Sequence, residues 1–105
     1  MPVPLSEMRI TLKRVGEDVW RLEVIQVIDP RVPRDELEQA YRYEKKLADM
    51  CPNMEIELVR EAGRWVAKTW VEADFHFLSM MLASYFAAQL GGRVELVVGG
   101  MAEAG

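Results

Sequence analysis

The stretch FHFLSMMLASYFAAQL, from Phe75 to Leu90, decides how this chain folds. Its sixteen residues include no Asp, Glu, Lys or Arg, and Gly91 and Gly92 follow it directly. A surface helix normally carries a polar arc on its wet side, and this stretch has none. As a helix it would reach only about 24 Å, which is short of the roughly 30 Å hydrocarbon core of a bilayer. We therefore expect a buried helix of a globular protein and no membrane span.

The two flanks of this expected helix differ in size. At about 100° per residue, the large side chains gather on one flank, which consists of Phe75, Leu78, Leu82 and Phe86. Burial of apolar area contributes roughly 25 cal/mol per Å², so this flank should pack on a sheet. The opposite flank carries small residues that allow another backbone to approach closely. We expect a homodimer with an interface at this flank, formed by Ser79, Ala83 and Ala87.

Composition and charge narrow the class of protein. The 105 residues are 50% hydrophobic and 29% charged, which predicts one globular domain over residues 1–98 and a flexible tail over 99–105. The net charge is -4 and no segment is basic, which argues against a nucleic-acid partner. The lone Cys51 and lone His76 provide no zinc-binding cluster, and no cofactor motif is present. Because the first residues lack the features of a secretory signal, we expect a cytoplasmic protein without metal or cofactor.

Hydrophobic periodicity divides the chain into seven elements. Alternation of apolar and polar residues predicts strands that begin at Met8, Val19, Met54, Arg64 and Arg93. An amphipathic helix follows Pro33 and ends before Pro52-Asn53. The second strand becomes apolar on both sides from Val24, which predicts a central position in the sheet.

The expected fold is α+β: a two-layer sandwich in which a five-stranded, mostly antiparallel sheet carries two helices on one face. From the second strand onward the element order is that of the ferredoxin-like split βαβ sandwich, which leaves the position of the first strand open. The alternative is a duplicated strand-strand-helix unit. It rests on an internal echo, since the pattern Met-x-Ile-x-Leu-x-Arg occurs at residues 8–14 and again at 54–60.

Two sets of residues are candidates for a functional site. His76 lies near the start of the apolar helix with Glu72 and Asp74 close by, which is a weak candidate for acid-base catalysis. Asp74 has a simpler role available as a helix N-cap. Trp65, Trp70 and His76 are candidates for an apolar ligand site. We expect Cys51, at the end of the first helix, to be buried and inert.

These observations lead to three hypotheses about function. The first is a small homodimeric binding or interaction module for a partner protein or an apolar small molecule. The alternative is a cofactor-free enzyme that uses His76 with Glu72 or Asp74. A weaker alternative is nucleic-acid binding by the first hairpin, where Arg9, Lys13 and Arg21 form a short basic stripe diluted by acidic neighbours.

Overall fold

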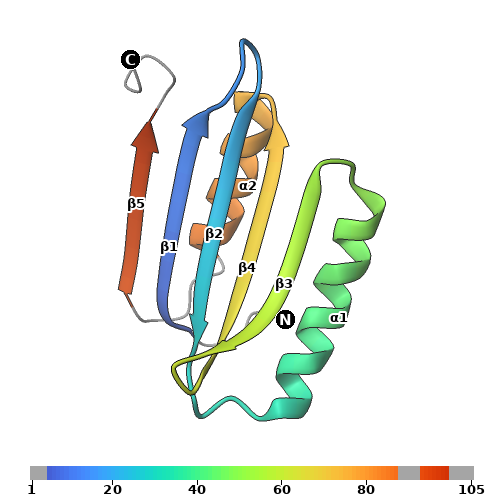
Figure 1. Ribbon diagram of the computed structural model, residues 1–105, viewed down its shortest axis with the longest axis vertical. Helices are drawn as coiled ribbons and strands as arrows, with labels where there is room; N and C mark the ends of the chain where they lie inside the picture. The colour runs from blue at the N-terminus through green and yellow to red at the C-terminus, as the bar shows by residue number, and fades with distance from the viewer. Residues whose placement is uncertain (1–4, 88–92, 100–105) are drawn as a thin grey trace.

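The computed structural model describes residues 5–87 and 93–99, which form one sheet of five strands and two helices (Figure 1). In chain order the elements are β1 (Leu5–Arg14), β2 (Trp20–Ile28), α1 (Arg34–Met50), β3 (Met54–Glu61), β4 (Arg64–Ala73), α2 (Phe75–Ala87) and β5 (Arg93–Gly99). This order confirms the α+β prediction. Residues 88–90 of the expected apolar helix and residues 100–105 of the expected tail lie outside the described part of the chain.

The strands lie in the order β3-β4-β2-β1-β5, and every neighbouring pair is antiparallel except β1 with β5, which is parallel. This arrangement settles the position of the first strand. In a ferredoxin-like sheet β2 would have β4 and β5 as its two neighbours. Here β1 pairs with β2 instead and moves β5 outward by one position, so that β5 is still an edge strand but has β1 as its neighbour (Figure 1). The central position of β2 agrees with its apolar second half.

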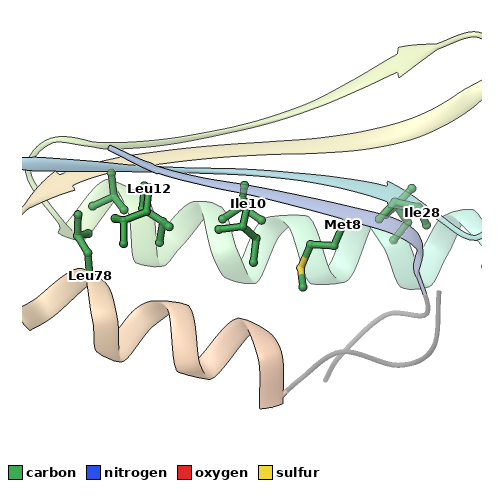
Figure 2. Close-up of a cluster of buried hydrophobic side chains, with 9 residues drawn as sticks. Met8, Ile10, Leu12, Ile28 and Leu78 are labelled. Carbon is green, nitrogen blue, oxygen red and sulfur yellow. The ribbon is translucent and has the colours of Figure 1, made fainter. Parts of the chain in front are cut away.

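Both helices lie on the same face of the sheet, and the core fills the space between the layers (Figure 2). Side chains of β1 and β2 that face the helices are buried, and Leu78 of α2 is fully buried against them. The cluster consists of Met8, Ile10, Leu12, Leu22, Val24, Ile28, Leu37, Val71 and Leu78. The large flank of α2 therefore faces the sheet through Leu78, whereas Phe75, which was expected to pack on the sheet with it, is 49% exposed.

The two hairpins of the sheet turn differently. The β3–β4 hairpin closes with two residues, Ala62 at φ 51° and Gly63 at φ 77°. Two successive positive φ values are typical of the turns that match the right-handed twist of paired strands. The β1–β2 hairpin has a longer turn, in which the backbone N–H groups of Val15 and Gly16 both donate to the carbonyl of Val19 at 3.0 Å. Each turn joins two strands that the sequence predicted.

Helix α1 begins after Pro33, which provides no side-chain cap, and Asp35 and Glu36 lie in its first turn. It ends at Met50, and the chain leaves in an extended conformation at Cys51, with φ -111° and ψ 125°. The prediction that Cys51 is buried is wrong, because its thiol is exposed. The change of backbone direction removes Cys51 from the helical stripe that buries Leu37 and Ala48.

Candidate functional site

The start of α2 is organised by a cap. The Asp74 carboxylate accepts a hydrogen bond from the backbone N–H of Phe77 at 2.8 Å, which confirms the N-cap predicted for it. Glu72, at the end of β4, forms an ion pair with Arg21 of β2. His76 lies on the first turn of α2 and is exposed. The two carboxylates proposed as its acid-base partners thus already have other partners.

The two predicted ligand-site tryptophans lie on opposite faces of β4. Trp65 packs against the core on the helix-covered face, with the Arg60 guanidinium 5.4 Å from its ring centre. Trp70 lies on the open face, where its indole N–H donates to Glu55 at 3.1 Å and the Arg21 guanidinium is 5.3 Å from its ring centre. Since residues five apart in a strand point in opposite directions, no single pocket is lined by both tryptophans.

The outer α2 surface, which we define as Phe75, Phe77, Met80 and Ala83, is open to solvent and mostly apolar, and the exposed His76 lies among these residues. Phe75 and Phe77 stand at its two margins, about 160° apart around the helix. Met80 is 59% exposed, and the two phenylalanines are 49% and 46% exposed. Phe75 also contacts Trp20 edge to face, with ring centres 4.9 Å apart. Helix α2 contains no Asp, Glu, Lys or Arg. The solvent-exposed side of a helix normally carries charged side chains that interact with water, and this surface has none of them.

The edge strand β5 provides a second exposed apolar surface on the same side of the sheet. The register pairs Leu96 with Ile10 and Val98 with Leu12, so both side chains share the helix-covered face. Nevertheless they are 44% and 56% exposed, because α2 packs over β2 and β4 and leaves this edge uncovered. We call Leu96 and Val98 the β5 shelf. Val97, which points to the open face, is also 48% exposed.

The small flank of α2 faces the β5 side. Tyr85 marks the other flank, because its hydroxyl lies near Glu44 of α1, and α1 packs on β3 at the opposite end of the sheet. At 100° per residue, Ser79 and Ala83 are directed away from Tyr85 and therefore toward β5. Ser79 is half-buried and donates its hydroxyl to the Phe75 carbonyl at 2.8 Å, and Ala83 is exposed. The side chain of Ala87, the third predicted interface residue, lies outside the described part of the structure.

The open face of the sheet carries apolar residues, and charged side chains of the same face lie around them. Val66 lies between Val27 and Val59 in the register and is buried, while Ile25 is half-buried. Cross-strand ion pairs surround these residues: Arg9–Glu95, Lys13–Glu23, Arg21–Glu72 and Lys68–Glu61. Arg21 also pairs with Glu23 along β2. A shallow, open hollow on this face is lined by Glu7, Arg9, Ile25, Val27, Glu61 and Lys68. Most of the charged side chains on the open face therefore have an oppositely charged partner on that same face.

A polar cluster that the sequence reasoning missed joins the two helices to the sheet. It consists of Glu44 of α1, Tyr85 of α2 and Thr69 of β4. Burial raises the pKa of the Tyr85 phenol to about 12, the Glu44 charge adds to that rise, and a contact with Thr69 opposes it. Burial also raises the pKa of Glu44. The Thr69 hydroxyl is buried and makes no hydrogen bond of normal geometry within the described residues, so its contact with Tyr85 is weak. One sequence signal was available, because Glu44 falls on the same stripe of α1 as Leu37 and Ala48.

Neither a metal site nor a known relative identifies this chain. Among residues 5–87 and 93–99, no three His, Cys, Asp or Glu side chains lie close enough together to hold a metal ion. The helices of that same part are too short or too polar to cross a bilayer. The chain matches no protein-family model, no curated protein and no solved structure. Its exposed apolar surfaces are therefore the best guide to what it does.

Proposed function

We propose that this protein is a homodimeric interaction module, and that the outer α2 surface together with the β5 shelf forms its binding face. The observation that carries the proposal is the exposure of Phe75, Phe77 and Met80 on a helix without a charged side chain. Water contact with such a surface is unfavourable by roughly 25 cal/mol per Å² of apolar area. Covering it with a partner is the simplest way to recover that free energy.

The size of the surface agrees with a partner of modest footprint. A phenylalanine side chain presents roughly 150–250 Å², so two that are half exposed contribute on the order of 200 Å². Met80, Leu96 and Val98 bring the apolar total to roughly 400 Å², within the range of about 300–600 Å² for the largest patch on a monomeric protein, which is often a functional site. A standard interface buries about 800 Å² per partner, of which slightly more than half is apolar. The exposed apolar area is thus about what one side of such an interface contains.

A second copy of the chain suits this face better than a charged partner. The outer α2 surface has no Asp, Glu, Lys or Arg side chain, and the exposed His76 provides only one imidazole with which to select an oppositely charged protein or a nucleic acid. Ser79 and Ala83 allow close approach of another helix, and the same flank of a second copy provides the matching small surface. A two-fold axis pairs a patch with itself and closes the assembly at two subunits.

The enzyme alternative has less support. His76 is exposed, Asp74 caps α2, and Glu72 is held by Arg21. A general base needs a defined partner and a site that limits access of water, and His76 has neither among the described residues.

Molar mass in solution tests the homodimer. We expect light scattering coupled to size-exclusion chromatography to give a dimer that dissociates only on large dilution. Met80→Glu should raise the dimer dissociation constant by tenfold or more, because a loss of about 1.4 kcal/mol corresponds to each factor of ten. Met50→Glu is the matched control, because Met50 is 80% exposed on α1, far from the proposed face. A parent protein that stays monomeric at every concentration, or equal effects of the two substitutions, would contradict the proposal.

A further inference from the structure

We infer that β5 is the strand through which two copies join, by pairing antiparallel with the β5 of a second copy around a two-fold axis. The two sheets would then form one continuous sheet of ten strands. This inference rests on the proposed homodimer and specifies its geometry. It starts from the difference between the two edges of the sheet.

The β3 edge has the protection that natural proteins give to free strand edges. Charged residues alternate along it, at Glu55, Glu57 and Glu61, and α1 packs along the same strand (Figure 1). Inward or outward charges and a covering helix both discourage addition of another strand. A second chain would therefore gain little by pairing at β3.

Within the part of the chain that the structure describes, three successive residues of the β5 edge lack that protection. Its run Leu96-Val97-Val98 is β-branched or aliphatic, carries no charge, and is about half exposed on both faces of the sheet. The neighbouring Glu95 carboxylate lies 3.4 Å from the Arg9 guanidinium, so its charge is already balanced within the same molecule. A β-prone run without charge on a strand edge is a template for strand addition.

A second β5 is the partner that closes the assembly. Pairing of β5 with the β3 of another copy would leave a free β5 and a free β3 at the ends, and the chain of subunits would grow without limit. Pairing of β5 with β5 consumes both unprotected edges at once. It also brings the two β5 shelves side by side on the helix-covered face, beside the small flanks marked by Ser79 and Ala83. The strand edge and the outer α2 surface then belong to one interface.

Hydrogen exchange of β5 measures this pairing directly. In a parallel pair with β1, alternate amides of β5 donate to β1 and the others point outward. At a protein concentration about a hundredfold above the dimer dissociation constant, only about 7% of the chains are monomeric, so the outward amides should exchange on the order of tenfold more slowly than in a Met80→Glu sample diluted until it is monomeric. If the parent is a dimer whose outward β5 amides exchange as in the variant, the strand pairing is wrong and the homodimer stands. If the parent is a monomer, both proposals fail.

A cysteine scan provides the second, independent test. In a Cys51→Ser background, single cysteines replace Glu95, Leu96, Val97 or Val98, and a Glu61→Cys variant on the β3 edge is the control. Around a two-fold axis only the position nearest the axis brings two sulfurs within bonding distance. We therefore expect one β5 position to form a disulfide-linked dimer at least tenfold faster than its neighbours and the control. Equal rates at all five positions would overturn the inference.

Discussion

The two halves of this chain begin with the same pattern and meet different environments. Met8-x-Ile10-x-Leu12 in β1 and Met54-x-Ile56-x-Leu58 in β3 each face the helices from the first strand of a hairpin. The three side chains in β1 are at most 2% exposed, whereas in β3 only Ile56 is buried. The difference arises because β5 flanks β1, while β3 is an edge strand. Identical local patterns thus reach different degrees of burial, because their neighbours in the sheet differ.

Truncation of the two equivalent leucines is the sharpest test of this difference. Leu12→Ala should lower the free energy of unfolding by about 3–5 kcal/mol, since it leaves a cavity in a closed core. Leu58→Ala should lower it by roughly half of that or less, because the half-buried site already has solvent on one side. Urea unfolding of both variants measures the two costs. Equal losses of unfolding free energy would show that Leu12 and Leu58 contribute equally to stability in spite of their different burial.

The polar cluster between the halves predicts a loss of stability at high pH. Below a pH of about 10, Tyr85 is protonated in both the folded and the unfolded chain, so the pKa difference has no effect. Between pH 10 and 12 the unfolded chain releases the phenol proton and the folded chain, with a pKa of about 12, retains it. Stability should therefore fall by roughly 2–3 kcal/mol as the pH rises through this window.

Tyr85→Phe is the matched variant for this alkaline effect, since it removes the ionisable group and keeps the ring. We expect its stability to decline less between pH 10 and 12, as followed by urea unfolding at each pH. Parallel declines in the parent and the variant would mean that Tyr85 titrates with an ordinary pKa in the folded state.

The helices of the two halves also begin differently. Asp74 caps α2 through its bond to the Phe77 N–H, whereas Pro33 leaves α1 without a side-chain cap. Asp74→Ala should cost about 1 kcal/mol, and Pro33→Ser should cost little or add a few tenths of a kcal/mol through a new cap. Thermal unfolding followed by circular dichroism gives both shifts. A larger drop in melting temperature for Pro33→Ser than for Asp74→Ala would contradict the assignment of a side-chain cap to α2 and not to α1.

The smallest expected difference lies in the two hairpin turns. Gly63 has φ 77°, a region that an alanine adopts only with strain, so Gly63→Ala should cost about 0.5–1 kcal/mol. Gly16 has no such backbone angle, and an added Cβ would meet Val19 at 3.4 Å, an ordinary contact. Gly16→Ala should therefore change the melting temperature little. If it is as costly as Gly63→Ala, the first turn requires glycine for another reason.

Several parts of the candidate site could be predicted from the sequence and others could not. The N-cap role of Asp74 follows from local spacing, and so does the division of α2 into a large and a small flank. The separation of Trp65 from Trp70 also follows from strand periodicity, although a shared ligand site was expected for them. The exposure of Leu96 and Val98 could not be predicted, because alternation shows which face a side chain takes and not whether a helix covers that face.

The sequence by itself determined the seven elements, their order and the helix surface that lacks Asp, Glu, Lys and Arg. Each of these depends on periods of two or 3.6 residues and on the backbone preferences of Gly, Pro and Asp, which act within a few positions. Only the tertiary structure decided that β1 lies between β2 and β5, that Glu44 meets Tyr85 and Thr69, and that β5 is left as an unprotected edge. These outcomes depend on which distant strands pair, and that choice is made by the packing of the whole sheet against α1 and α2.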